Sequence, residues 1–212
     1  MHDLDALTVR SISVSEMNNN VYVLTSKLSG AQVLIDAADD APAILTLLAE
    51  AQKDANSPVS LALIVTTHSH WDHVRALREV RELTQASTAA GADDIGDIAV
   101  PTDIPMKHGE IRNVDDIELE VIHLRGHTPG SVAVLYRDLH GPAHLFTGDS
   151  LFPGGVGNTN GDAGRFVSLY DDVVTRIFDY LPDDTLVHPG HGTGTTLGAE
   201  RSKLPEWKQR GW

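Results

Sequence analysis

Four side chains of metal-binding type lie within six positions of this sequence, at His68, His70, Asp72 and His73. They directly follow the apolar run Leu61 to Val65, which predicts a buried strand. In an extended segment His68 and His70 point to the same side, because side chains alternate along a strand. Imidazole and carboxylate groups suit zinc and similar divalent ions, and four of them are enough to begin two metal sites. The alternative is a polar surface loop, which the position directly after a core strand disfavours.

Three later loops each add one residue of the same type, and each loop directly follows a predicted strand. These residues are His127 after the strand 119–124, Asp149 after 143–146 and His191 after 185–187. Glycine-rich turns surround all three, and glycine lets the backbone approach a site closely. Taken singly, His127 would be an ordinary turn residue and Asp149 a turn or helix-capping residue. Four such loops in one chain of 212 residues indicate a shared metal centre.

In this pattern the sequence resembles the metallo-β-lactamase superfamily of hydrolases, over nearly the whole chain. The ordered pattern His-x-His-x-Asp-His, followed by a distant His, Asp and His, is matched by His68, His70, Asp72, His73, His127, Asp149 and His191. The strings Thr-His-Ser-His-Trp-Asp-His, Gly-His-Thr-Pro-Gly-Ser and Gly-Asp-Ser-Leu-Phe are most similar to the glyoxalase II-like (hydroxyacylglutathione hydrolase-like) group. True metallo-β-lactamases usually have Cys or Ser at the position of Asp149, so antibiotic hydrolysis is not the favoured interpretation.

The resemblance implies an α/β fold, the four-layer αββα sandwich in which two sheets face each other and helices cover them outside. Strands followed by a helix in each half of the sequence favour the same layers. We find no linker that divides the sequence, and expect residues 1–212 to form a single metallo-β-lactamase-like domain.

Hydrophobic periodicity places the individual elements along the chain. Strands are expected at 8–14, 21–26, 31–36, 61–65, 118–124, 132–136, 145–147 and 185–187. Helices are expected at 41–53, with Pro42 in the first turn, at 74–83 and at 169–181. The stretch 89–105 is small, acidic and broken by glycines, and it is the hardest to assign.

The resemblance also implies how the ligands are shared between two divalent ions. Each ion has three residues of its own and one in common: His68, His70 and His127 for the first, Asp72, His73 and His191 for the second, and Asp149 for both. Zinc is the first expectation for the metal, although iron and manganese accept the same nitrogen and oxygen donors. Two such ions, about 3.5–4 Å apart, lower the pKa of a shared water and stabilise a developing oxyanion.

These features predict a binuclear hydrolase of a small thioester or ester, in which a metal-bridging hydroxide attacks the carbonyl. Asp72 is the expected catalytic residue, because it would orient the hydroxide and take its proton. The alternatives are a lactonase on the same fold, a mononuclear iron dioxygenase of persulfides, and a metal-bearing scaffold without turnover. Glyoxalase II enzymes have a helical C-terminal extension that helps to bind the glutathione thioester, and residues 192–212 are too few to form it. The physiological substrate therefore stays open.

Composition restricts the partners of the protein. The formal charge of −14 and the pI near 5.0 disfavour nucleic acid, so a small-molecule substrate is expected. The first residues lack the basic and apolar segments of a secretory signal, and no apolar run is long enough to cross a membrane. The absence of cysteine excludes disulfides and cysteine-based metal or nucleophilic sites. We therefore predict a cytoplasmic enzyme without a membrane partner.

Four further features have more than one interpretation. Arg165 would bind an anionic substrate group or pair with Asp162 on the surface. Tyr170 would reach an oxyanion, as in lactonases, or pack within its helix. The glycine-rich loop 152–161 is expected to line the mouth of the site. The tail 206–212, with two Trp residues, would cap the fold, form a homodimer contact or border the pocket.

The remaining histidines match no ligand position: His2, His108, His123, His140, His144 and His188. His140 and His144 flank a Gly-Pro turn and are expected to be solvated hairpin residues. His188 is either a residue that orients the site from outside the ligands or an ordinary polar residue. Trp71 is expected to pack beneath the metal loop. The serines next to ligand positions are expected to be structural, because a metal-activated water needs no side-chain nucleophile: Ser69, Ser131 and Ser150.

Overall fold

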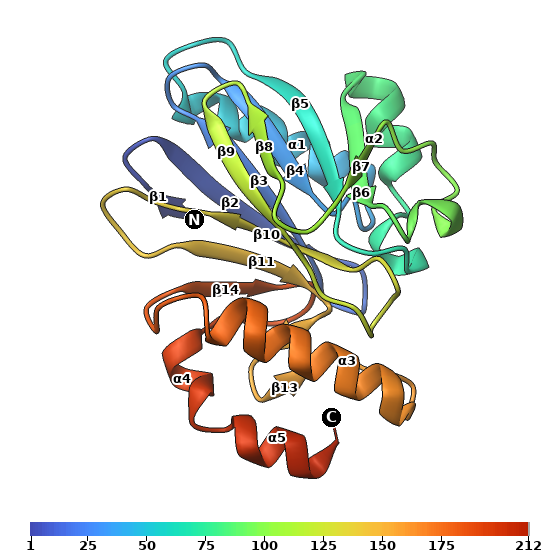
Figure 1. The fold of residues 1–212 in the computed structure, drawn as a ribbon. Helices are drawn as coiled ribbons and strands as arrows, with labels where there is room; N and C mark the ends of the chain where they lie inside the picture. The colour runs from blue at the N-terminus through green and yellow to red at the C-terminus, as the bar shows by residue number, and fades with distance from the viewer. Residues whose placement is uncertain (212) are drawn as a thin grey trace.

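The computed structural model describes residues 1–211, and in it two β-sheets pack face to face between helices (Figure 1). The first sheet has the spatial order β1 (His2–Asp3), β2 (Leu7–Val14), β3 (Asn19–Ser26), β4 (Ala31–Ile35), β5 (Ser60–Thr66), β6 (Ser87–Gly91) and β7 (Ile104–Met106). The second has the order β15 (Thr195–Thr196), β14 (Leu186–Pro189), β11 (His144–Gly148), β10 (Val132–Tyr136), β9 (Ile117–His123) and β8 (Ile111–Val114). A small hairpin joins β12 (Leu151–Phe152) to β13 (Gly155–Val156). These layers confirm the predicted αββα sandwich.

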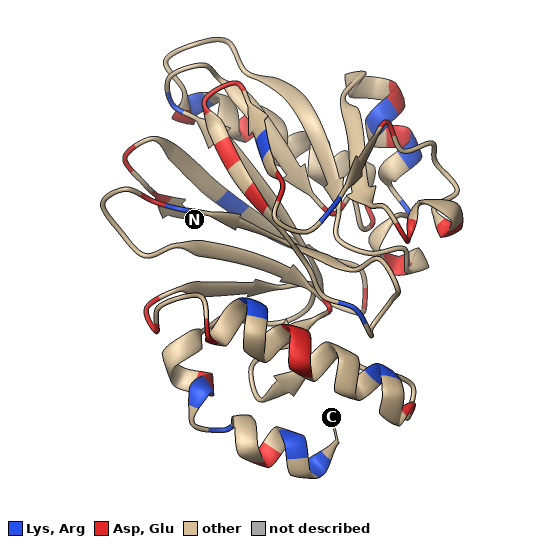
Figure 2. Ribbon diagram, in the orientation of Figure 1, with Lys and Arg blue, Asp and Glu red and all other residues tan. Residues whose placement is uncertain are grey.

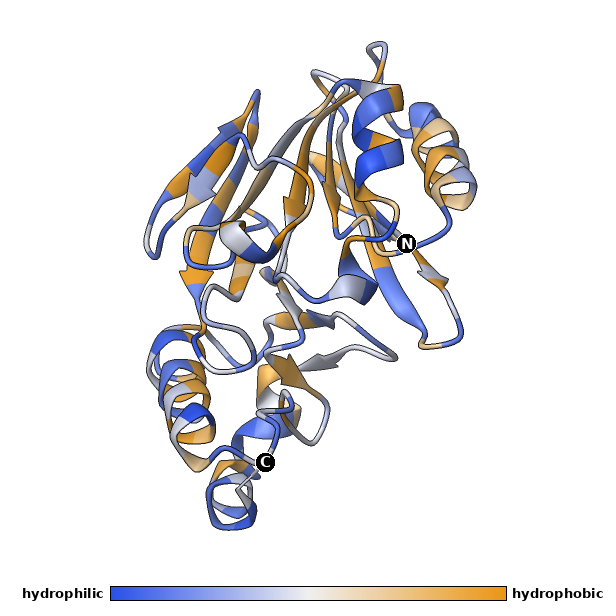
Figure 3. Cartoon of the chain, turned by 90° about the vertical axis from the view of Figure 1, so that its right-hand side faces the viewer, coloured by the Kyte–Doolittle hydropathy of each residue, from blue (hydrophilic) through white to orange (hydrophobic). Residues whose placement is uncertain are grey.

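Apolar side chains fill three layers between these elements. The central layer lies between the sheets and includes Val33, Val65, Val121 and Phe146, all fully buried. Helices α1 (Ala41–Glu50) and α2 (Leu77–Thr84) cover the outer face of the first sheet. Helices α3 (Ala163–Val173), α4 (Leu197–Arg201) and α5 (Leu204–Arg210) cover the second. Figure 3 shows the hydrophobic residues concentrated in the strands, as this burial requires.

Two of the predicted helices begin elsewhere than expected. Helix α2 begins at Leu77 and not at Val74, because the amides of Arg75 and Ala76 donate to carbonyls of the loop after β4. Helix α3 begins at Ala163, six residues before the predicted start. The cause is Asp162, whose carboxylate accepts hydrogen bonds from two amides of the first turn and caps the helix. A π-helical turn, Val174–Phe178, extends α3 at its other end.

Parallel strand pairing determines where the loops of this fold meet. β4 pairs in parallel with β5, β5 with β6, and β6 with β7, so the carboxyl ends of these strands lie at one edge of the first sheet. In the second sheet β11 pairs in parallel with β14 in the same way. Residues that directly follow β4, β5, β11 and β14 are therefore brought together. Strands β6 and β7 form the two ends of the stretch that was hardest to assign.

Charged residues of both signs are distributed over the helices and loops (Figure 2). Within residues 1–211 no helix is long and apolar enough to cross a membrane. In the tail, Trp207 of α5 is buried and its ring lies 6.1 Å from that of Phe178, so this part of the tail caps the fold. Trp212, which the same prediction included, lies outside the described residues.

Candidate metal centre

The seven predicted ligand residues converge at one edge of the two sheets. His68 and His70 follow β5, Asp72 and His73 lie in the 3₁₀ turn Trp71–His73, and His127, Asp149 and His191 follow β9, β11 and β14. Their ligand atoms form three overlapping groups in which all atoms lie within 4.8 Å of one another: His68 with His70 and His127, His68 with His73 and Asp149, and Asp72 with His73 and His191. The first and third groups are the two ligand sets that the sequence predicted. The second group joins them.

Asp149 lies at the centre of the cluster. Its Oδ2 atom is 3.3 Å from Nε2 of His191, 3.7 Å from Nε2 of His127 and 4.0 Å from Nε2 of His68. Its Oδ1 atom is 3.5 Å from Nε2 of His73. The carboxylate therefore faces imidazoles of both predicted sets, as a residue shared by two ions must.

The histidine rings are held with Nε2 inward by oxygen acceptors at Nδ1. Nδ1 of His127 contacts the carbonyl of Asn158 at 2.8 Å, and Nδ1 of His191 contacts that of Met17 at 2.9 Å. Because a carbonyl only accepts, Nδ1 carries the proton in both rings and Nε2 keeps its lone pair. Metal-binding histidines are oriented in this way by their second nitrogen.

Three buried atoms of the cluster lack a hydrogen-bond partner within residues 1–211: Nε2 of His68, Nε2 of His127 and Oδ1 of Asp149. Buried polar atoms are normally paired, so an unpaired group of this kind requires a cause. A divalent cation between these atoms would satisfy all three, since nitrogen lone pairs and carboxylate oxygens are the donors that such ions accept. The residues present therefore fit a metal ion.

Burial also keeps two of these imidazoles unprotonated. The pKa of His68 lies well below its usual value because the ring is fully buried and faces the other histidines, chiefly His73. Burial likewise lowers the pKa of His127. Both rings are therefore neutral at neutral pH, which is the form that binds a metal.

In the other set, the pKa of each histidine is raised while no ion is bound. Burial would lower the pKa of His73, but the carboxylates of Asp36 and Asp149 outweigh it and raise this pKa to about 10. The hydrogen bond to Asp149 also raises the pKa of His191. Burial would raise the pKa of Asp149, yet the nearby imidazoles of His191 and His73 hold it below its usual range. A divalent ion would replace these protons and balance the same carboxylate charge.

Sequence reasoning missed the buried carboxylate of Asp36, directly after β4. It accepts hydrogen bonds from the amide of Thr67 at 2.8 Å, the hydroxyl of Thr67 at 2.8 Å and Nδ1 of His73 at 2.9 Å. The Thr67 hydroxyl in turn contacts Nδ1 of His68 at 3.0 Å. Asp36 thus orients one imidazole of each set. Asp36 directly follows an apolar strand, as Asp149 does. The criterion that identified Asp149 in the sequence could therefore also have identified Asp36.

Two further residues support the loops without having been predicted. Asn19 donates from Nδ2 to the carboxylate of Asp72 at 3.0 Å and to the carbonyl of the same residue at 3.1 Å. Asp94 accepts from the amide of Ser69 at 2.8 Å, from the hydroxyl of Thr128 at 2.6 Å and from the amide of Gly130 at 2.6 Å. Asp94 thereby joins the loops that carry His70 and His127.

Replacing Asp36 with asparagine is expected to weaken metal binding by about 10- to 100-fold, because a carboxylate behind a ligand histidine orients the ring and increases its basicity. The Asp36 carboxylate accepts from Nδ1 of His73 and from two Thr67 donors. The asparagine amide is neutral and has only one acceptor oxygen, so it cannot replace all three interactions. Competition with a metal-sensitive dye measures the change. Asp39→Asn is the matched control, because Asp39 pairs with Arg75 on the surface. Equal affinities in the two variants would refute the role of Asp36.

The Arg165 side chain has a role that the sequence did not predict. Its guanidinium donates to the carbonyls of Gly126 and His127, so the side chain holds the loop of one ligand residue. Only its backbone amide contacts Asp162. Tyr170 packs in its helix, with its hydroxyl donating to the carbonyl of Leu204 at 2.9 Å.

The predictions for two aromatic side chains outside the ligand sets are wrong. Trp71 does not pack beneath the loop but is 57% exposed, with the Arg75 guanidinium 4.0 Å from its ring centroid. His144 is not solvated but 1% exposed, because it is the first residue of β11 and faces the space between the sheets. His140 is exposed, as predicted.

The serines next to the ligands differ in their contacts. Ser131 lies 2.5 Å from the Thr128 hydroxyl, and the amide of Ser69 binds Asp94.

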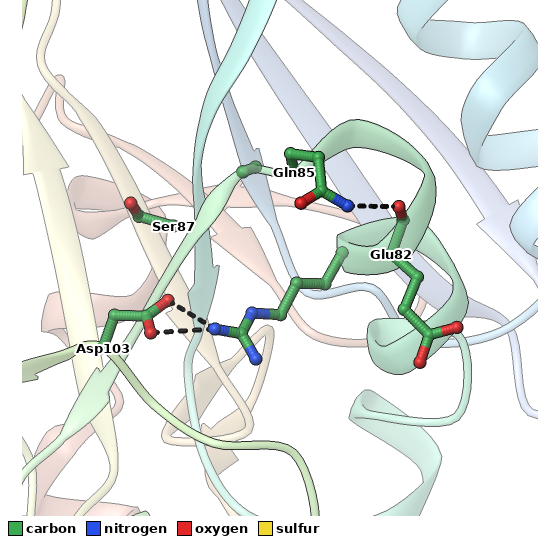
Figure 4. Close-up of a pocket in the computed structure, with 6 residues that line it drawn as sticks. Glu82, Gln85, Ser87 and Asp103 are labelled. Carbon is green, nitrogen blue, oxygen red and sulfur yellow. Dashed lines mark hydrogen bonds and ion pairs between the residues drawn. The ribbon is translucent and has the colours of Figure 1, made fainter.

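A surface hollow elsewhere, beside α2, contains none of the seven predicted ligands (Figure 4). It is crossed by an ion pair of 2.8 Å between Arg81 and Asp103, so these two charges balance each other there.

The chain belongs to the metallo-β-lactamase superfamily, whose sequence pattern matches residues 14–191. The hydroxyacylglutathione hydrolase GloC of Haemophilus influenzae is 27% identical over 218 residues, which cover 94% of this chain and 97% of that protein. The human mitochondrial persulfide dioxygenase ETHE1 is 32% identical over 188 residues, which cover 87% of this chain and 69% of that protein. Two proteins named for different reactions are thus similar to this chain over most of its length.

Solved structures give the same result for the fold. The crystal structure of the B3 metallo-β-lactamase BLEG-1 matches with a TM-score of 0.80 and 27% identity, over 94% of this chain and 99% of that one. The crystal structure of TTHA1623 in a di-iron-bound form matches with a TM-score of 0.68 and 27% identity, over 91% and 96% of the two chains. The superfamily match and the His and Asp clusters together indicate a site suited to divalent metal.

Proposed function

We propose that this protein is a binuclear metal-dependent hydrolase of a small thioester or ester, similar to the hydroxyacylglutathione hydrolases. The observation that carries the proposal is the convergence of seven ligand-type residues, with Asp149 among them and three buried atoms left unpaired among the described residues. Similarity to the Haemophilus influenzae hydroxyacylglutathione hydrolase over most of both chains supports this class of reaction.

Two ions are proposed, with zinc first and iron or manganese as alternatives. The two sets are His68, His70 and His127 for one ion, and Asp72, His73 and His191 for the other, with Asp149 shared. The di-iron form of the similar protein TTHA1623 supports two ions rather than one. When bound, such ions lower the pKa of a water molecule and polarise a substrate carbonyl.

The residues of the chain would then position the water and the substrate. Asp72, held by Asn19, would orient the attacking water and accept its proton on the carboxylate. The side chains of His191 and Asp149 are 20% and 13% exposed and His70 is also partly exposed, so the substrate would enter where these residues reach the surface. The Phe152 ring lies 6.5 Å from that of His191 and offers an apolar surface there.

The glycine-rich loop after Asp149 is proposed to border this entrance. The carbonyl of Asn158 in this loop holds His127, so loop and centre are directly linked. Gly157 lies so close that an added Cβ would be 1.7 Å from the Asp149 carbonyl. A substitution in this loop would therefore alter the positions of His127 and Asp149.

A persulfide dioxygenase is the second candidate, favoured by the 32% identity to human ETHE1. It would contain one iron ion and consume oxygen. The lactonase alternative is less favoured, because the Tyr170 hydroxyl is bound to the Leu204 carbonyl and does not face the centre.

Three assays on the metal-reconstituted protein distinguish these reactions. S-lactoylglutathione is tested for thiol release, an acyl-homoserine lactone for ring opening, and glutathione persulfide for oxygen uptake. We expect the thioester to be cleaved fastest, without oxygen uptake. Oxygen uptake with persulfide and no thiol release would instead establish the dioxygenase, and turnover of none of the substrates would favour a scaffold.

A further inference from the structure

Three histidines meet between the two sheets, away from the metal centre. They are His2 on β1, His144 at the start of β11 and His188 on β14. One nitrogen from each lies within 4.8 Å of the other two. Nδ1 of His144 is 3.0 Å from Nε2 of His188, and the ring of His2 is 4.9 Å and 5.3 Å from their rings.

This cluster is separate from the seven ligands described above. His144 is the first residue of β11, whereas Asp149 follows the last residue of that strand. Because a strand rises about 3.3 Å per residue, the two lie on the order of 16 Å apart along the chain. His188 points into the space between the sheets, where its ring stacks on Phe146 at 4.7 Å and on His144 at 5.1 Å.

The chemistry of the cluster suits a cation that prefers imidazole. His144 and His188 are buried, and burial, together with the neighbouring imidazoles, lowers their pKa values to about 4 and about 3. Both rings are therefore neutral at neutral pH, and each can offer a lone pair when an ion replaces the hydrogen bond between Nδ1 of His144 and Nε2 of His188. The candidate group contains no carboxylate, and three neutral imidazoles favour zinc, copper or nickel over calcium or magnesium.

The geometry requires little adjustment to bind an ion. With metal–nitrogen bonds of about 2.0–2.1 Å, two nitrogens 3.0 Å apart subtend about 95° at the metal, and a separation of about 3.3 Å gives the tetrahedral angle. His2 lies on the exposed two-residue edge strand β1, so its imidazole can approach the other two rings. A surface pocket of about 430 Å³, lined by His2, His188 and Thr195, provides a path for the ion and room for a water ligand.

We propose that His2, His144 and His188 form an additional, structural site for Zn²⁺, distinct from the catalytic centre. The ion would join β1 of the first sheet to β11 and β14 of the second. It would thus stabilise the packing of the two sheets without taking part in turnover. The proposal is independent of the reaction that the catalytic centre performs.

The test compares the wild-type protein with His2→Gln, which removes the exposed ligand and no buried group. Both proteins are dialysed to equilibrium against the same buffered free Zn²⁺. Zinc per chain, melting temperature and turnover are then measured. His140→Gln is the matched control, because His140 is an exposed histidine on the turn before β11 and belongs to no cluster of metal-ligand side chains among the described residues.

We expect the wild type and His140→Gln to bind one more Zn²⁺ per chain than His2→Gln. The melting temperature of His2→Gln should rise less on addition of zinc, while turnover is equal in all three proteins. Equal zinc content in the wild type and His2→Gln would overturn the proposal. A second variant, His144→Gln, checked for folding by circular dichroism, should lose the same ion; if it does not fold, the His2→Gln comparison decides alone.

Discussion

Asp149→Ala is expected to lower kcat/KM for hydrolysis by about 1,000-fold or more, equivalent to about 4 kcal/mol of transition-state stabilisation. The reason is that one carboxylate faces His68, His127 and His191 through Oδ2 and His73 through Oδ1. Its loss removes the shared donor of both proposed ions and leaves the neighbouring imidazoles without their counter-charge. Bound metal should fall with activity, and both are measured on the same preparation.

Asp171→Ala is the control for this variant, because Asp171 is an exposed carboxylate on α3. It should retain wild-type metal content and turnover. If Asp149→Ala kept both ions and hydrolysed substrate at the wild-type rate, Asp149 would not be a shared ligand, and the arrangement proposed for the centre would have to be abandoned.

Gly190→Ala is expected to disrupt the centre nearly as strongly, although glycine offers no ligand. An added Cβ would lie 2.2 Å from Oδ1 of Asp149 and 2.8 Å from Cε1 of His73. The backbone cannot withdraw, because the Gly190 amide donates to the Gly148 carbonyl at 2.8 Å and its carbonyl accepts from Asn20 at 2.7 Å. The Asp149 carboxylate and the His73 imidazole must therefore be displaced.

We expect this variant to lose about 100-fold or more of kcat/KM and to be destabilised by about 1–3 kcal/mol, as overpacked sites usually are. Denaturant unfolding and metal analysis measure the two effects. Gly96→Ala is the matched control, because an added Cβ at Gly96 meets no atom of the described residues within 4 Å. Normal activity in Gly190→Ala would show that the cluster tolerates displacement of Asp149, and a tightly positioned bridging carboxylate would then be the wrong description of the centre.

Much of the site could be predicted because its ligands follow a simple rule. His68, Asp149 and His191 directly follow buried strands or lie within three residues of their ends, and parallel pairing brings such ends together. Hydrophobic runs and ligand-type residues are both visible in a sequence. The side chains that orient the ligands follow no such local pattern. Asn19 and Asp94 act only through contacts with distant loops, which tertiary structure alone creates.

The errors have a related cause. A Gly-Pro turn predicts that the neighbouring residues are solvated. His140 is exposed as predicted, but His144 is the first residue of β11, where it pairs with Tyr136 and its side chain is buried. The start of α3 was missed because the cap at Asp162 precedes the apolar periodicity by several residues. In both cases one residue at an element boundary decided the outcome, and hydrophobic periodicity is least informative at boundaries.

The most direct test of the binuclear centre is a titration of metal-free protein with Zn²⁺, in which bound metal and thioester hydrolysis are measured at each addition. The His2→Gln variant is used, so that the cluster between the sheets does not enter the count. With a binuclear centre, hydrolysis should reach its maximum when two ions are bound per chain. Full hydrolysis without metal, or a maximum at one ion per chain, would contradict a binuclear mechanism.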